Sequence, residues 1–367
     1  MKKKIKLRSL AFLSLLLCKS PVQAQDTTAS TAPAPTLQFS GYAEAYYSYD
    51  FNEPADHNKA TFLYSHSRHN EFNLNLGYLK AAYSAARIRA NLALAAGTYM
   101  NANYAAETGV LKNIFEANAG VRLGRKQLWL DAGIFGSHIG FESAISKDCW
   151  TLTRSILAEN SPYYEAGAKL TYSTDNGKWL MSVLALNGWQ RITRVDGNSM
   201  MSWGTQLQYK PSGNVLLNYS TFLGTDKPDT ARLLRVFHNV YGTFQLSEKW
   251  GLTTGFDIGT EEKTPSADGT NLWYSPVVIV RFAVNKKWTV AARAEYYNDK
   301  DGVIISTETP NGFQTSGYSL NIDYSPVQNA LIRLEGRNLR NKDDSFAGKD
   351  GPSNNDSFIT ASIAISF

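Results

Sequence analysis

Cysteine is almost absent from this chain, which has only two among its 367 residues. Cys18 falls in an N-terminal segment that we expect to be removed, which leaves Cys149 without a partner. A disulfide framework and a cysteine-based zinc site are therefore both excluded. We expect backbone pairing and packing to hold the fold, with no metal and no cofactor.

Long apolar runs are also missing, apart from the N-terminus. Basic residues from Lys2 to Arg8 precede an apolar stretch that ends at Cys18, and Val22-Gln23-Ala24 is a small-residue cleavage pattern. This predicts a secretory signal peptide over residues 1–24. No later stretch approaches the roughly 18 to 20 apolar residues of a membrane-spanning helix. A mature chain in a membrane would have to be a closed barrel, because open sheet edges cannot be satisfied in hydrocarbon.

An excess of charge of one sign is lacking once that leader is set aside. The formal net charge is +5, but six of the 37 Lys and Arg residues lie in the leader, which has no acidic residue. The remaining 31 face 32 Asp and Glu residues. No clustered basic excess remains, so we expect no nucleic-acid partner.

What the chain does contain is alternation with a period of two. Residues 25–35 are rich in Thr, Ala and Pro and predict a flexible lead-in. From Leu37 the odd positions are mostly apolar and the even positions mostly polar, up to Tyr49. The same pattern returns over residues 87–95, 288–297, 330–337 and 359–367. One apolar and one polar face indicate half-buried strands, although parity alone does not say which face points inward.

The lengths of the connections separate a membrane barrel from a soluble sandwich. Seven short turns are expected near Ala85, Arg125, Asn176, Gly213, Glu248, Lys286 and Pro326. Between them fall eight longer polar stretches, at residues 52–70, 100–113, 137–162, 187–201, 224–230, 260–270, 298–312 and 341–354. Outer-membrane barrels have short periplasmic turns and long external loops. We therefore predict an all-β fold over residues 36–367, a transmembrane antiparallel up-and-down β-barrel of about 16 strands in the bacterial outer membrane.

Aromatic residues mark two further features of such a barrel. Trp179, Trp250 and Trp288 each follow a lysine just after a short turn, where a membrane-interface girdle needs amphipathic rings. Aromatic caps on a soluble barrel are the alternative. The chain ends on Phe367, and an aromatic-terminated strand is typical of chains handled by the outer-membrane barrel-assembly machinery. Outer-membrane lipid and that machinery are the expected partners.

The segment from Trp129 to Tyr172 is the most specific part of the chain. It contains Trp-Leu-Asp-Ala-Gly-Ile-Phe-Gly-Ser-His-Ile-Gly-Phe-Glu-Ser, then Leu-Thr-Arg-Ser at 152–155 and Glu-Asn-Ser-Pro-Tyr-Tyr-Glu at 159–165. It resembles the outer-membrane β-barrel porin family often called porin-2 or OmpL-like, and the resemblance extends over most of the mature chain. It implies a porin that passes small solutes passively. It implies no particular solute and no binding residues.

The alternation of polar and apolar positions along each strand predicts which charged side chains would line a watery lumen. They are Glu44, Arg87, Arg89, Arg122, Asp131, Glu165, Lys169, Arg235, Asp257, Arg293, Glu295, Arg333, Glu335 and Arg337. Basic residues are in the majority, which favours a mild anion preference. The alternative is that these charges pair across strands and only keep the wall wet.

The longest loop, residues 137–162, is the candidate pore constriction, with a short helix expected within residues 152–159. Its apolar residues would pack on the wall while its charges reach the pore: His138, Glu142, Lys147, Asp148, Arg154 and Glu159. The alternative is an external loop that packs on its neighbours or on another subunit, and a homotrimer is one assembly to consider.

Two other functions compete with a channel for small hydrophilic solutes. An outer-membrane lipase needs a nucleophile beside a base, and His238, on the apolar face of its strand, has no serine among its same-face neighbours. We therefore do not expect an enzyme. A structural or adhesive barrel with a plugged lumen fits the same pattern of strands, so the sequence leaves it open.

Overall fold

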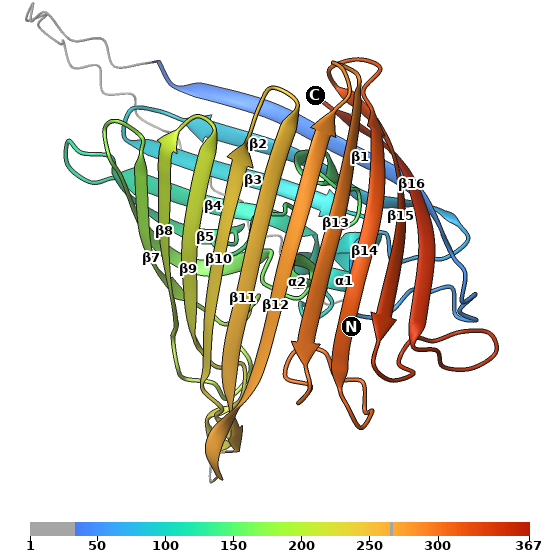
Figure 1. Cartoon of the computed structure of the whole chain (residues 1–367). Helices are drawn as coiled ribbons and strands as arrows, with labels where there is room; N and C mark the ends of the chain where they lie inside the picture. Colours follow the sequence, from blue (N-terminus) through green and yellow to red (C-terminus); the bar gives the residue numbers. More distant parts are fainter. Residues whose placement is uncertain (1–33, 265–266) are drawn as a thin grey trace, which may run out of the picture. The chain divides into compact units, whose positions relative to one another are not determined.

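The computed structural model describes residues 34–264 and 267–367, and the predicted signal peptide lies outside them. The strands form one closed barrel in which each pairs with its neighbours in sequence and β1 pairs with β16 (Figure 1). All pairings are antiparallel. The sixteen strands are β1 (Thr36–Asp50), β2 (Phe72–Ser84), β3 (Ile88–Ala96), β4 (Ile114–Arg122), β5 (Leu128–Gly136), β6 (Tyr164–Ser173), β7 (Trp179–Leu186), β8 (Ser202–Ser212), β9 (Val215–Gly224), β10 (Arg235–Gln245), β11 (Trp250–Thr264), β12 (Ala267–Ala283), β13 (Trp288–Asp299), β14 (Phe313–Tyr324), β15 (Ala330–Asn341) and β16 (Asn355–Ser366).

Helical segments are few and short. They lie in the loops: α1 (Thr98–Asn103), η1 (Gly109–Asn113), η2 (Ser146–Asp148), α2 (Ile156–Glu159) and η3 (Asp229–Ala231). In the described residues, no helix is long and apolar enough to span a membrane. The barrel of sixteen antiparallel strands confirms the predicted fold class.

The barrel turns its apolar face outward. Along β12 to β14, Val280, Leu320 and Ile322 project from the wall and stay exposed, whereas Glu295 and Asn321 on the alternate positions are buried inside. A soluble barrel or sandwich would have the opposite arrangement. Because every strand has two neighbours, no edge is left unpaired, which is what hydrocarbon requires.

All seven predicted short turns are present, and they share one end of the barrel. They cover residues 85–87, 123–127, 174–178, 213–214, 246–249, 284–287 and 325–329. In the turn before Trp179, Gly177 has a φ of +66°, a left-handed value that glycine adopts readily. The Oδ1 atom of Asn176 accepts a hydrogen bond from the Lys178 amide at 3.0 Å. Local turn chemistry of this kind explains why these positions could be predicted.

One predicted loop is wrong. Residues 260–270 were expected to form a long polar loop, but β11 continues to Thr264 and β12 begins at Ala267. The two strands stay paired to the tip: Glu261 lies opposite Asn271, and after a register shift Thr264 lies opposite Ala267. Polar composition alone does not indicate a loop here, because a hairpin that extends beyond the membrane can be polar on both faces and still pair its backbone.

Candidate pore constriction

The connection between β5 and β6, residues 137–163, folds into the barrel; we call it the constriction loop. It starts and ends on β5 and β6, yet its backbone amides donate to Asn321 on β14 and Glu295 on β13. Strand β13 lies eight positions from β5, which is halfway round a closed ring of sixteen. The loop therefore crosses the lumen and narrows it.

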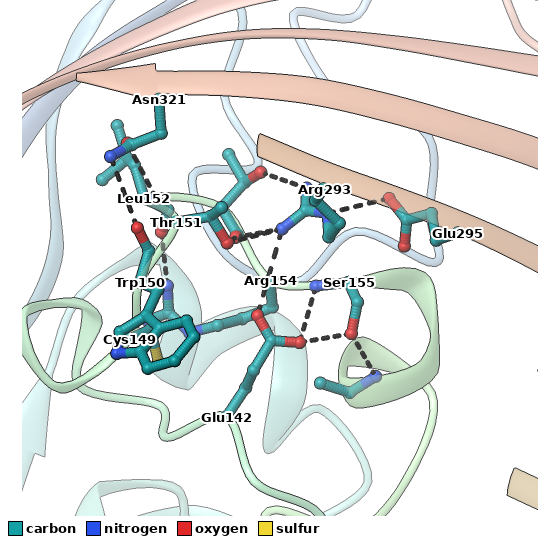
Figure 2. A network of polar contacts seen from close by, with 12 residues as sticks. Glu142, Cys149, Trp150, Thr151, Leu152, Arg154, Ser155, Arg293, Glu295 and Asn321 are labelled. Atoms are coloured by element: carbon teal, nitrogen blue, oxygen red, sulfur yellow. Dashed lines mark hydrogen bonds and ion pairs between the residues drawn. The ribbon is translucent and has the colours of Figure 1, made fainter. Parts of the chain in front are cut away.

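Arg293 is the centre of the contacts on the far side. It donates from Nη1 to the carbonyl oxygen of Thr153 at 2.7 Å and from Nη2 to Glu335 at 3.1 Å. Glu335 in turn accepts the Thr153 amide at 2.6 Å. Figure 2 shows Arg293 between the loop and Glu295, to which its Nε donates at 3.1 Å. All these side chains are buried, so the wall and the loop form one hydrogen-bonded unit.

The same arrangement continues on β14 and β15. Arg333 donates to both carboxylate oxygens of Asp323, at 2.7 and 2.9 Å, and to the carbonyl oxygen of Cys149 at 3.0 Å. Asn321 accepts the Leu152 amide at 3.1 Å. We call the inward faces of β13, β14 and β15 the anchoring wall, because their polar side chains satisfy the backbone of the loop. Buried backbone groups need such partners.

Arg154 shapes the loop from within. Its guanidinium donates to the carbonyl oxygens of Ser143, Ala144 and Leu152, and the Ala144 bond is 2.9 Å long. Glu142 accepts the Ser155 amide at 3.0 Å and lies 3.9 Å from Arg293. Burial raises the pKa of Glu142, against the attraction of Arg293. The charges of this loop therefore serve mainly to fold it and to attach it.

His138 fastens the base of the loop. Its Nδ1 lies 2.9 Å from each carboxylate oxygen of Glu165 on β6, and its Nε2 lies 2.9 Å from the carbonyl oxygen of Thr221 on β9. Both partners are acceptors, so both ring nitrogens have to carry a proton. Burial opposes the charge, but Glu165 outweighs it and raises the pKa of His138. Gly204 leaves room for the ring, since a Cβ there would lie 2.6 Å from Nε2.

The first external loop, residues 51–71, packs on the constriction loop. Glu159 accepts the amides of Tyr64 and Ser65 at 3.1 Å each. Burial raises the pKa of Glu159, against the attraction of Arg154. On β1, Glu44 accepts from Ser146 of the constriction loop and lies 3.4 Å from His66 of the first loop. Two inward-folded loops thus support each other.

The structure divides the six predicted constriction residues into two groups. His138, Glu142, Arg154 and Glu159 are buried and make the contacts described above. Lys147 and Asp148, in η2 at the tip of the loop, stay exposed. A direct effect on passing ions stays a prediction, and this placement limits it to Lys147 and Asp148.

Most predicted lining residues do point inward, but many are paired. Arg89 donates to Asp131 at 2.7 Å, and Arg235 donates to Glu261 at 2.9 Å. Arg337 donates to Glu295 at 2.7 Å. Asp257 accepts from Asn239, whereas Arg87 lies in a short turn before β3 and is exposed. Ion selection by these charges stays a prediction.

Five inward charged side chains have no such role in holding the loop; we call the surface that they form the open wall. They are Arg89 on β3, Arg122 on β4, Asp131 on β5, Lys169 on β6 and Lys210 on β8. None of these five side chains hydrogen-bonds to the constriction loop within the described residues. Arg122, Lys169 and Lys210 make no ion pair within 4.0 Å there either. The open wall therefore carries uncompensated positive charge.

Sequence reasoning missed several residues that hold the loop. Asn321, Asn239 and Gln206 are uncharged but bond to the loop backbone. Their alternation with outward apolar residues is visible in the sequence, so the same parity rule could have nominated them. Charge alone does not identify them, because an amide side chain satisfies buried backbone groups without carrying a charge.

The predicted girdle residues begin their strands at the short-turn end, each beside an aromatic partner on the next strand. Trp179 stacks on Tyr209, Trp250 packs on Phe282, and Trp288 packs on Tyr324. Such outward aromatic pairs suit a bilayer interface, and contact with lipid stays a prediction. At the seam, Phe367 exchanges two backbone hydrogen bonds with Gly41, and its ring covers that glycine. Its function as an assembly signal is likewise a prediction.

A closed sixteen-stranded barrel with an apolar exterior and an inward-folded loop defines an outer-membrane channel of the porin class. The family model described as "Putative beta-barrel porin-2, OmpL-like" matches residues 36–367, and the chain belongs to that family. A search of curated proteins finds none that matches. The predicted family and the predicted porin function are thereby confirmed, and the family and the fold indicate a channel rather than an enzyme.

Solved structures share the fold at low sequence identity. An anion-selective porin from Comamonas acidovorans has a TM-score of 0.60 at 10% identity, covering 91% of this chain and 100% of its own. The trimer form of OmpT from Vibrio cholerae has 0.59 at 8%, with 91% and 100% covered. The outer-membrane channel DcaP of Acinetobacter baumannii has 0.57 at 13%, with 91% and 97% covered. These likenesses concern the fold.

Proposed function

We propose that this porin lets small hydrophilic solutes diffuse passively past the constriction loop, with a mild preference for anions. The observation that carries the preference is the charge balance of the lumen. On the anchoring wall each arginine has a carboxylate partner, so that wall contributes little net field. On the open wall Arg122, Lys169 and Lys210 have none within the described residues, and a pore lined by excess positive charge favours anions.

The precursor is proposed to be exported through a signal peptide cleaved after Ala24 and inserted by the barrel-assembly machinery. A homotrimer is proposed as its assembly. Strands β3 to β7 are only 8–10 residues long, whereas β11 to β16 have 12–17. Because β3 to β7 are short, this side of the barrel exposes less surface to lipid. Such a side suits contact with other subunits. The trimeric OmpT neighbour supports this idea at the level of the fold.

The preference can be measured in planar bilayers under a potassium chloride gradient. The expected reversal potential has the sign of a channel that passes chloride more readily than potassium. A cation-selective channel would overturn the preference and leave the porin function standing. A barrel that conducts no ions, and whose liposomes do not swell in small sugars or amino acids, would instead support the plugged structural or adhesive alternative.

A further inference from the structure

A cleft of about 370 Å³ opens at the short-turn end of the barrel, below the tip of the constriction loop. Its lining comes from that tip and from the short-turn ends of β12 to β16. Two cations face it, Lys147 of the loop and Arg281 of β12, together with the ring of Trp150.

Tertiary contacts position both cations. The Nζ atom of Lys147 donates to Ser366 on β16 at 2.9 Å. The Arg281 guanidinium lies 5.9 Å from the centre of the Trp150 ring. That ring packs against Gly251 on β11, where a Cβ would lie 2.7 Å from the ring. The missing side chain at Gly251 lets Trp150 reach the wall and support the guanidinium.

The charge of the cleft is positive by one unit. Neither Lys147 nor Arg281 has a carboxylate within 4.0 Å among the described residues. Two acidic residues also line the cleft. Asp323 is compensated by the two hydrogen bonds from Arg333, which leaves Asp148 as the opposing charge. Two unpaired cations at one cleft attract an anion more strongly than either does alone.

We propose that this cleft is a binding site for small anions that carry a carboxylate or phosphate group. Lys147 and Arg281 hold the charged group, and the Trp150 ring contacts an apolar part of the ligand where it has one. The proposal rests on the function proposed above and adds to it one defined binding site at the short-turn mouth of the lumen. A guanidinium and an ammonium supply the charge-assisted hydrogen bonds that such groups accept most strongly.

The test uses the full-length mature protein folded in a non-ionic detergent, with inorganic phosphate as the probe and its binding followed by 31P nuclear magnetic resonance. Saturable binding is expected. Lys147→Gln and Arg281→Gln should each weaken it about tenfold, the effect of one lost charge-assisted hydrogen bond. Lys210→Gln removes the same charge from the open wall and serves as the matched control, with binding unchanged. Arg281→Lys should restore part of the affinity.

The outcomes separate the site from the function on which it rests. Absence of saturable binding to the wild-type protein, or equal weakening by Lys147→Gln and Lys210→Gln, overturns the site. Single-channel current in potassium chloride, recorded with the same preparations, tests the channel independently. Circular dichroism and heat-dependent gel migration identify any variant that fails to fold. If Arg281→Gln does not fold, Arg281→Lys replaces it. Loss of conductance with phosphate binding retained would reject the channel and keep the site.

Discussion

The anchoring wall and the open wall, two parts of the inner surface of this barrel, carry similar residues in different surroundings. On the anchoring wall, Arg293, Arg333 and Glu335 are buried and bonded to the backbone of the constriction loop. On the open wall, Arg89 pairs with Asp131 but keeps 37% of its side chain exposed. Burial makes the difference, because a charge removed from water has to be fully compensated, whereas a hydrated charge does not. The same residue types thus hold the loop on one wall and face the pore on the other.

The largest expected effect on stability and channel current comes from removing one buried charge on the anchoring wall. Arg293→Gln would leave Glu335 buried without the arginine that it pairs with, and would take from Glu295 one of its two arginine partners. The expected cost is about 3–5 kcal/mol in the free energy of unfolding. The loop should also move more freely, so single-channel current should become larger and noisier. Denaturant unfolding in lipid vesicles and single-channel recording measure the two effects.

Arg89→Gln is the matched control on the open wall. Its partner Asp131 is buried, but Arg89 itself is partly solvated, so the pair should contribute no more than about 1 kcal/mol. Equal losses of stability in Arg89→Gln and Arg293→Gln would contradict the distinction between the two walls.

An intermediate effect is expected from the protonation of His138. Its pKa is raised in the folded protein, so the ion pair with Glu165 contributes fully below the ordinary histidine pKa of about 6.5. The contribution is lost as the pH rises through the raised value. The positive charge of Lys169 on β6 opposes this protonation. Current noise in the wild-type channel should therefore increase on going from acidic to alkaline solution.

His138→Gln provides the comparison for that titration. Glutamine can bond Glu165 but has no proton to lose in this range, so its noise should not depend on pH. A pH dependence that survives in His138→Gln would assign the titration to another group.

The smallest effect is expected on the open wall. Lys169→Gln and Lys210→Gln each remove one charge that has no ion-pair partner in the described part of the chain. Solvent and salt screen such charges, so each should lower the chloride preference by less than about twofold, with no change in stability. Reversal potentials in a salt gradient measure the change. A shift as large as that from Arg293→Gln would show that the open wall also acts through the loop.

The sequence was sufficient for the strands because their determinants are local. Alternation set which residues share a face of β1 or β16, and turn residues such as Asn176 and Gly177 set where strands end. The error at residues 260–270 has the opposite cause. Whether polar residues there form a loop depends on a partner strand, and Glu261 opposite Asn271 is a pairing that composition does not reveal.

The sequence alone determined a closed barrel with an apolar exterior, because an alternating pattern and sorted turn lengths are one-dimensional properties of the chain. It also identified residues 137–162 as the loop most able to narrow the lumen. The tertiary structure decided what the charges do. Arg154 became a support within the loop, and Lys147 stayed exposed. Burial depends on which segments meet across the lumen, and partners such as Thr153 and Glu335 are 182 residues apart.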